Sequence, residues 1–307
     1  MKIVLHNPAH NGDILFGSKI IDIIVKSNPN QEFIISPSCS TVLFEHLKSE
    51  NVVIQMNDYQ WVYETNIFPD KDNYLFKQHD ILWSVSSGSE APVEDRLVPD
   101  HEDGKLYINI WQIMCFNRNN NMNLVGRIEV INNLFSEIKD KVGIELYFNA
   151  KHYTELVPEI PQLDTSYINN YMNNRLYDKR IFFFNLKGCS GSECFPPNFN
   201  NDFIKQLLNE NPQSLVIVPD TCTIKHARLI SLMDDLNIKK EASGKSLVNY
   251  ANICNLCDEV YFKNNGGSLF TFNVVNIQNK KVKYYFLNGH DEFYHIMKNV
   301  YGLNIVN

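Results

Sequence analysis

The sequence has little positive charge and no long apolar run, and both shortages restrict its partners. Its 307 residues carry a formal net charge of −7 at pH 7, which argues against general binding to nucleic acid or to anionic membranes. No stretch approaches the ~20 consecutive apolar residues of a membrane span. The first apolar run, residues 3–5, is too short for a signal peptide. We therefore expect a cytoplasmic protein.

Cysteines are present, but they do not form a recognisable framework. The chain has 7 cysteines, an odd number, and this does not resemble the disulfide pattern of a secreted domain. Its one C-x-x-C pair, Cys254 and Cys257, lacks a second Cys or His pair at zinc spacing and lies in a predicted helix. We expect two buried thiols there, and no bound metal.

The motifs of several common α/β enzymes are missing too. The first strand-to-helix turn lacks the G-x-G-x-x-G of dinucleotide-binding folds, which disfavours NAD as a cofactor. The chain has no Walker A motif and no G-x-S-x-G nucleophile elbow. It also lacks the D-x-D-like metal pair of the other common nucleotide-sugar fold. A typical dehydrogenase, P-loop enzyme or serine hydrolase is therefore not expected.

What the chain does have is a regular alternation of strand and helix patterns. Short apolar runs rich in β-branched and aromatic residues predict strands. In the first half these are residues 2–6, 32–38, 52–56, 80–86 and 106–111. Helical spacing of apolar residues between the first three runs predicts helices at 14–27 and 40–50, and a further amphipathic helix at 124–143. Strand, helix, strand, helix is typical of a parallel sheet covered on both faces.

A second series of the same kind follows a connection with two prolines, residues 158–180. Its predicted strands are residues 180–188, 214–220, 259–264 and 282–289, and its predicted helices include 200–212, 223–236 and 246–257. We therefore predict two α/β domains, residues 1–165 and 166–307, each with its own sheet.

Three loops fall where ligands bind in open α/β sheets, beyond the carboxyl ends of strands. They carry Gly12 and Asp13 in the first loop, Lys187, Ser190 and Gly191 in the second, and Asn265, Gly266, Gly267 and Ser268 in the third. Backbone N–H groups, hydroxyls and an ammonium group suit phosphate. The combination indicates a diphosphate-bearing donor in the second half and a carboxylate, Asp13, across the cleft. Asp13 is alternatively only the N-cap of the helix that starts at Ile14.

The order of these motifs resembles the ADP-heptose:lipopolysaccharide heptosyltransferases, which form glycosyltransferase family 9. Residues 11–38 resemble the family's opening Gly-Asp turn and helix. Residues 182–219 resemble the opening of its nucleotide-binding domain, and residues 246–275 its last ligand-binding turn. The likeness spans nearly the whole chain. It implies a GT-B type fold, in which two Rossmann-like domains face each other across a cleft.

The resemblance also implies a reaction and a set of roles. The enzyme would be a metal-independent, inverting glycosyltransferase that moves a sugar from a nucleotide-diphosphate donor to a glycan or glycolipid hydroxyl, without a cofactor. Asp13 would be the general base. The donor-binding residues would be Gly12, Lys187, Ser190, Gly191, Asp220, Asn265, Gly266, Gly267 and Ser268. Aromatic side chains that pack on sugar faces, Tyr59, Trp61 and Tyr63, are the acceptor-binding candidates, although Trp61 could equally anchor a surface loop.

This chain departs from the family pattern at two places. Asn264 and Leu269 stand where the family has Asp and His, and Asp220 is the nearest counterpart of the family's acidic residue at the ribose. A nucleotide sugar other than ADP-heptose, or an inactive relative, is therefore left open. Two other functions remain as alternatives, a non-catalytic nucleotide-sugar or glycan-binding protein and a sugar-nucleotide epimerase. No nucleic-acid partner is expected, and peripheral contact with a membrane is left open.

Overall fold

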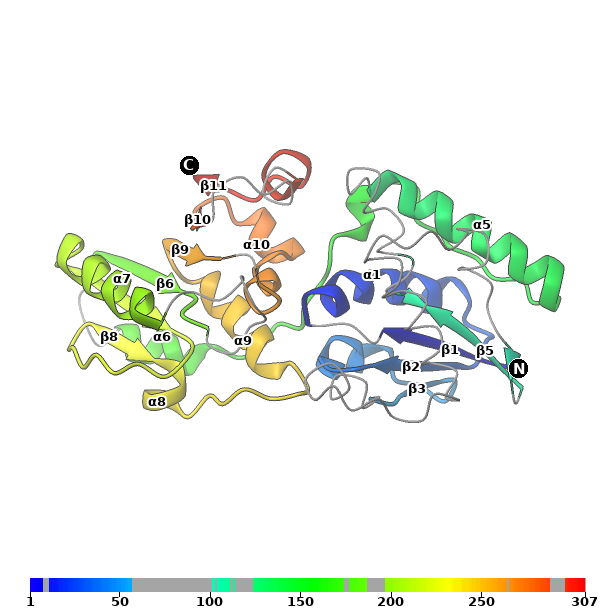
Figure 1. The fold of residues 1–307 in the computed structure, drawn as a ribbon, viewed down its shortest axis with the longest axis horizontal. Helices are drawn as coiled ribbons and strands as arrows, with labels where there is room; N and C mark the ends of the chain where they lie inside the picture. Colours follow the sequence, from blue (N-terminus) through cyan, green and yellow to red (C-terminus); the bar gives the residue numbers. More distant parts are fainter. Residues whose placement is uncertain are drawn as a thin grey trace. The chain divides into compact units, whose positions relative to one another are not determined.

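The computed structural model divides the chain into two compact units, Met1–Leu156 and Val157–Asn307 (Figure 1). It describes residues 1–7, 11–56, 101–102, 104–110, 113, 124–173, 177–186, 197–263, 265–287 and 296–306. The division falls before residue 157, whereas the sequence placed it after residue 165. Hydrogen bonds explain the difference, because the Pro158 carbonyl accepts from the Val274 N–H and the Pro161 carbonyl from Asn252 Nδ2, both at 3.0 Å.

Unit 1 is a five-stranded sheet with helices. Its elements in chain order are β1 (Lys2–Asn7), α1 (Asn11–Ser27), β2 (Phe33–Pro37), the 3₁₀ helix η1 (Thr41–Leu47), β3 (Val52–Ile54), β4 (His101–Glu102), β5 (Lys105–Asn109), α5 (Leu124–Val142) and the 3₁₀ helix η4 (Tyr153–Leu156). The strand order is β3-β2-β1-β5-β4. All pairs are parallel except β4 with β5.

The apolar periodicity of unit 1 correctly predicted most of these elements. Ile14, Leu15, Ile20, Ile21 and Ile24 of α1 are all fully buried, which is the face that helical spacing indicated. The helix predicted at residues 40–50 is the 3₁₀ helix η1. The strand predicted at residues 80–86 lies outside the described residues.

Unit 2 is a six-stranded, fully parallel sheet. Its elements are α6 (Ser166–Asn173), β6 (Lys179–Phe183), α7 (Pro197–Glu210), β7 (Ser214–Val218), β8 (Leu229–Ser231), α8 (Leu232–Leu236), α9 (Lys245–Cys254), β9 (Glu259–Phe262), the 3₁₀ helix η6 (Ser268–Thr271), α10 (Val274–Gln278), β10 (Lys283–Phe286), the π-helical turn η7 (Ile296–Val300) and β11 (Ile305–Val306). The strand order is β11-β10-β9-β6-β7-β8.

The strand orders identify both units as Rossmann-like. Numbered within unit 2, the sheet reads 3-2-1-4-5-6 from β8 to β11, and the four parallel strands of unit 1 read 3-2-1-4. In such sheets the order reverses beside the first strand, and ligands bind at the carboxyl ends of the strands there. The expected ligand positions are thus the ends of β1 and β5 in unit 1 and of β6 and β9 in unit 2.

The helix predicted at residues 223–236 was wrong over most of its length. Leu229–Ser231 form β8, which pairs in parallel with Val216–Val218 of β7, and only Leu232–Leu236 are helical. Ile230 is fully buried, so strand pairing and burial prevail over helix propensity here. Ser231 then caps the short helix, since its side chain accepts from the Asp234 N–H at 3.1 Å.

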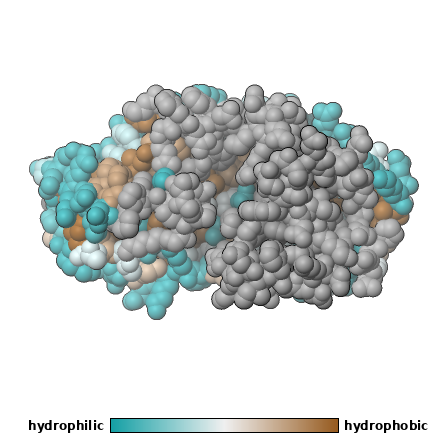
Figure 2. All heavy atoms as spheres, in the orientation of Figure 1, coloured by the Kyte–Doolittle hydropathy of each residue, from teal (hydrophilic) through white to brown (hydrophobic). Residues whose placement is uncertain are grey.

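The core of unit 2 explains the alternation in its strands. On one face, Ile181, Phe183, Val216 and Val218 pack with apolar residues of α7, including Ile204. The outer side of α7 is hydrophilic, with apolar residues visible between the polar ones (Figure 2). Within the described ranges, no helix has the length and apolar character needed to cross a membrane.

Candidate functional site

Buried polar side chains gather at the carboxyl edge of the unit 1 sheet. They are His6 and Asn7 of β1, Ser36 of β2, Ser38 and Ser40 after it, and Asn109 of β5, each at most 6% exposed. His6 lies beside Ser36 on one side and Asn109 on the other in the strand register. In open α/β sheets ligands bind at the carboxyl edge, where the strand order reverses, so this polar edge is the candidate site of unit 1.

Asp13 lies in the first turn of α1, next to this edge. The helix begins at Asn11, so Asp13 is its third residue and the prediction that it is the N-cap was wrong. Two contacts hold this turn to the strands. Asn7 Nδ2 donates to the Asp13 carbonyl at 3.3 Å, and Ser40 Oγ donates to Asn11 Oδ1 at 2.5 Å. Asp13 is half-buried, and the positive end of the helix dipole favours its carboxylate.

The negative charge of Asp13 contributes to the pKa of the Cys39 thiol. Burial raises the pKa of the Cys39 thiol to about 11, contacts with Ser38 and Ser40 oppose this shift, and the negative charge of Asp13 adds to it. Cys39 is 1% exposed, so it stays a neutral thiol at pH 7. Asp13 is thus among the groups whose charge acts on the segment after β2.

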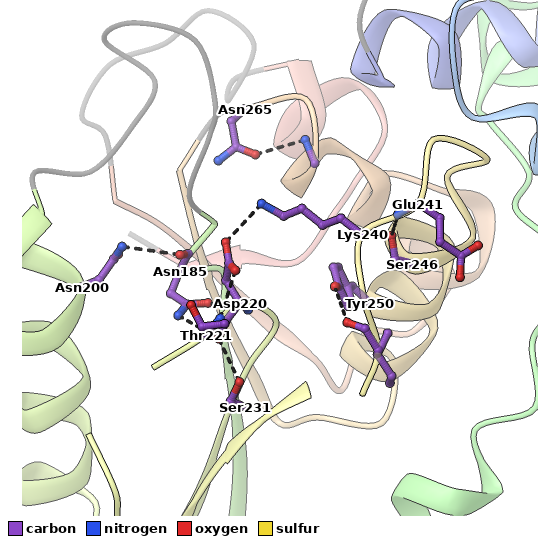
Figure 3. Close-up of polar contacts among 12 residues, drawn as sticks. Asn185, Asn200, Asp220, Thr221, Ser231, Lys240, Glu241, Ser246, Tyr250 and Asn265 are labelled. Atoms are coloured by element: carbon purple, nitrogen blue, oxygen red, sulfur yellow. Dashed lines mark hydrogen bonds and ion pairs between the residues drawn. The ribbon is translucent and has the colours of Figure 1, made fainter. Parts of the chain in front are cut away.

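In unit 2, Asn185 joins the ends of two neighbouring strands (Figure 3). It follows β6, and its Oδ1 accepts from the Asp220 N–H at 2.9 Å, while its Nδ2 donates to the Asp220 carbonyl at 3.4 Å. The Asp220 carbonyl also accepts from Ser231 Oγ at 3.0 Å. Asn200, near the start of α7, donates to the Asn185 carbonyl at 3.4 Å. The carboxyl ends of β6 and β7 are therefore fixed by side chains.

Both carboxylate oxygens of Asp220 have partners. Oδ1 accepts from the Thr221 N–H at 3.0 Å, and Oδ2 accepts from Lys240 Nζ at 3.1 Å. The Asp220 side chain is 6% exposed and that of Lys240 is 43% exposed. At this edge the solvent-facing member of the pair is thus the ammonium group.

Lys240 belongs to a segment that leaves α8 and returns to α9. Asn237 and Gly244 bound it in left-handed conformations, with φ of 56° and 77°. The Glu241 N–H donates to Ser246 Oγ at 3.3 Å, which ties the segment to the first turn of α9. Tyr250 lies beneath, and burial together with the charge of Asp220 raises its pKa to about 12. Figure 3 shows Lys240 extending from this segment to Asp220.

The turn after β9 is closed by its own asparagine. Asn265 Oδ1 accepts from the Gly267 N–H at 3.1 Å and from the Ser268 N–H at 2.9 Å. Ser268 is fully buried, and its hydroxyl contacts the Lys263 and Asn265 carbonyls. These N–H groups and this hydroxyl are therefore engaged within the protein. Donor binding by Gly266, Gly267 and Ser268 stays a prediction.

Gly267 packs against Leu186, the residue directly before Lys187 in the second predicted loop. A Cβ at Gly267 would lie 2.6 Å from Leu186 Cδ1 and 3.3 Å from Leu247 Cδ2. The turn after β9 and the end of β6 are thus in direct contact, as the prediction of one donor site from two loops requires. Lys187, Ser190 and Gly191 themselves lie outside the described residues, as do Asn264 and the acceptor candidates Tyr59, Trp61 and Tyr63.

The remaining predictions fare as follows. Gly12 is buried in the first turn of α1. Cys254 and Cys257 are free, buried thiols, as predicted. In the part of the chain that the structure describes, no group of three or more His, Cys, Asp or Glu residues could hold a metal ion, and metal independence stays a prediction. Sequence reasoning missed Asn185, Ser40 and Lys240.

The chain matches no protein-family model and no curated protein, but its structure resembles solved glycosyltransferases. A family 9 glycosyltransferase from Veillonella parvula is 9% identical, with a TM-score of 0.47 over 99% of this chain and 84% of that one. E. coli heptosyltransferase WaaC, solved with ADP-2-deoxy-2-fluoro heptose, is 10% identical, with a TM-score of 0.40 over 95% and 90%.

A third structure in this group has another described activity. The UDP-N-acetylglucosamine 2-epimerase from Listeria monocytogenes, named as putative, is 9% identical, with a TM-score of 0.43 over 95% of this chain and 80% of that one. At such identities the likeness concerns fold alone, and one fold supports several reactions. The function has to be argued from the residues at the two sheet edges.

Proposed function

We propose that this protein is a glycosyltransferase that uses a nucleotide-diphosphate sugar as its donor. The observation that carries the proposal is the position of Asp13. Asp13 lies in the first turn of α1, which Asn7 of β1 and Ser40 after β2 hold in place. In its described residues, the second unit has a parallel sheet of strand order 3-2-1-4-5-6. That sheet is an architecture for binding nucleotides at its carboxyl edge.

The donor belongs to unit 2 in this proposal. Its diphosphate would lie at the ends of β6 and β9, where Leu186 packs against Gly267 and where the predicted loop with Lys187, Ser190 and Gly191 begins. Preorganised N–H groups and a lysine there would stabilise the negative charge that develops on the leaving nucleoside diphosphate. In this proposal the leaving group is stabilised by these groups without a metal ion.

The acceptor belongs to unit 1. A hydroxyl held near Asp13 would lose its proton to the carboxylate as its oxygen bonds to the anomeric carbon, while the bond from that carbon to the diphosphate oxygen breaks. Because the incoming and leaving oxygens lie on opposite faces of the sugar, the anomeric configuration inverts. General base catalysis of this kind contributes about 10²–10⁴ in rate.

Binding tests the donor half of the proposal. Calorimetric titration of the whole chain with ADP, GDP, UDP and CDP, and with their common sugar conjugates, should identify one base with clear affinity. A chain that binds none of these nucleotides would overturn the proposed function.

Turnover tests the catalytic half, with Asp13→Asn compared to Asp140→Asn. Asp140 lies exposed on α5, and Asp140→Asn makes the same change in charge away from the site. Release of nucleoside diphosphate should fall at least about a hundredfold in Asp13→Asn only, with donor binding retained, and should persist in EDTA. Proton NMR of the glycoside product should show the inverted anomer. Binding with no turnover in the wild type would instead support the non-catalytic alternative.

A further inference from the structure

The ion pair between Asp220 and Lys240 crosses the carboxyl edge of the unit 2 sheet. It joins a residue that follows β7 to the segment between α8 and α9, with 3.1 Å between Asp220 Oδ2 and Lys240 Nζ. The pair lies beside Asn185, at the strand end that the proposed donor would approach (Figure 3). The question is which of its two members a ligand would contact.

Asp220 is built into the protein and offers little to a ligand. Its N–H and carbonyl bond with Asn185 and Ser231, and its carboxylate accepts from Thr221 and Lys240. Only 6% of its side chain is exposed. These contacts fix the carboxylate, and they make it a support for the ammonium group of Lys240 rather than an acceptor for sugar hydroxyls.

A diphosphate bound at this edge needs hydrogen-bond donors, and those of the turn after β9 already bond within the protein. The Gly267 and Ser268 N–H groups already donate to Asn265 Oδ1, and the Ser268 hydroxyl is buried. Lys240 is 43% exposed, and its position is set by a buried partner. A cation held in place loses less conformational entropy when it binds an anion than a freely moving lysine does.

We infer that Lys240 contacts a phosphate oxygen of the donor nucleotide, and that Asp220 is a positioning residue that holds the lysine there. This inference rests on the proposed function, since it assigns a role within the same donor site. It replaces the direct contact between Asp220 and the donor that the sequence predicted. It also assigns a role to the 237–244 segment, which brings Lys240 to Asp220 at the sheet edge, 20 residues earlier in the chain.

The test is a set of nucleotide titrations on Lys240→Met, with Lys239→Met as the matched control. Lys239 is the neighbouring exposed lysine, so both variants lose one positive charge from the same segment. The probes are the nucleoside, monophosphate and diphosphate of the base that the wild type prefers among adenine, guanine, uracil and cytosine. Lys240→Met should weaken diphosphate binding about 10–100-fold, as expected for a hydrogen bond to a charged group. Nucleoside binding should stay unchanged, and Lys240→Arg should retain part of the affinity.

The positioning role of Asp220 is tested with a double-mutant cycle. If Asp220 acts through Lys240, then Asp220→Asn should weaken diphosphate binding in the wild type, but not further in a Lys240→Met background. Asp220→Glu, which keeps the charge and shifts it by one methylene, serves if the Asn variant does not fold. Equal losses for nucleoside and diphosphate, or additive losses in the cycle, would overturn the inference.

Failure of this inference is distinguishable from failure of the proposed function. A wild type that binds no nucleoside diphosphate contradicts the proposed function itself. A wild type that binds one, together with a Lys240→Met variant that behaves like Lys239→Met, contradicts the role of Lys240 alone.

Discussion

The Asn265 turn offers a sharp test of how the unit 2 edge is built. Asn265→Ala removes the oxygen that accepts from both Gly267 and Ser268. The Gly267 N–H is partly exposed and can turn to water, so its loss is about 1 kcal/mol. The Ser268 N–H is buried and loses its acceptor, which costs about 1–3 kcal/mol. We therefore expect unit 2 to be destabilised by about 2–4 kcal/mol.

The measurement is differential scanning calorimetry of the whole chain. A loss of this size lowers the transition of a unit of about 150 residues by roughly 4–16 °C, at ~2–4 °C per kcal/mol. Asn209→Ala is the control, because Asn209 lies exposed on α7 and undergoes the same chemical change. Asn265→Asp should lose less than the Ala variant, since a carboxylate in the same place can still accept from both N–H groups.

One result would refute this reasoning. If Asn265→Ala melts within ~1 °C of Asn209→Ala, then the two hydrogen bonds do not hold the turn. Hydrogen exchange of the Ser268 amide gives the local view, because its protection should fall in Asn265→Ala and persist in Asn265→Asp.

Two further predictions concern unit 1 and the buried thiols. Burial would raise the pKa of Asp22, but hydrogen bonds from Lys26 and His46 outweigh it and lower the pKa. Asp22→Asn should therefore destabilise the protein by about 1–3 kcal/mol at pH 7. In urea titrations, the difference in unfolding free energy between the variant and the wild type should shrink as pH falls below ~4, because Asp22 becomes protonated as pH passes through its lowered folded-state pKa. A difference at pH 3 as large as at pH 7 would contradict the role of the Asp22 ion pairs. Cys39 and Cys254 are at most 1% exposed, so iodoacetamide should modify them only after denaturation, as mapped by peptide mass spectrometry; labelling of the native chain would contradict their burial.

The sequence predicted the layers of this fold well because strands and helices carry distinct periodicities. The parallel strands β1, β2, β6 and β7 are apolar runs of five or six residues, a length typical of buried strands and too short for most helices. It failed at β8, where Leu229–Ser231 have helix-like spacing and adopt a strand because β7 offers an edge to pair with. Pairing of this kind depends on neighbours that a local window does not contain.

The candidate site was predictable only in part, and the reason is again distance along the chain. Asp13 was found because a carboxylate at a strand-to-helix turn is a local pattern. Lys240 was not, because its contact lies 20 residues away at Asp220, and no spacing rule links a lysine before one helix to the end of an earlier strand. Asn185 likewise resembles any polar residue after a strand until its bonds to Asp220 are seen.

Ser40 shows how backbone strain can support the unit 1 edge. It is fully buried and left-handed, with φ of 55°, a conformation that costs a residue with a Cβ about 1–2 kcal/mol. Its hydroxyl contact with Asn11 holds the first turn of α1, and thereby Asp13, against the segment after β2. Strain of this kind collects at functional sites, where surrounding contacts maintain it.

A pair of variants separates the strain from the contact. Ser40→Ala and Ser40→Gly both lose the hydroxyl, but only glycine relieves the left-handed backbone, at an entropic cost of about 0.5–1 kcal/mol. Ser40→Gly should therefore be more stable than Ser40→Ala by about 0.5–1 kcal/mol in urea denaturation. Both should release nucleoside diphosphate more slowly than the wild type, with donor affinity unchanged, if the hydroxyl serves to place Asp13. A glycine variant that is less stable than the alanine variant would show that the backbone at residue 40 is not strained. Wild-type turnover in both variants would show that Ser40 contributes to packing only. It would contradict the idea that the Ser40 contact with Asn11 positions Asp13.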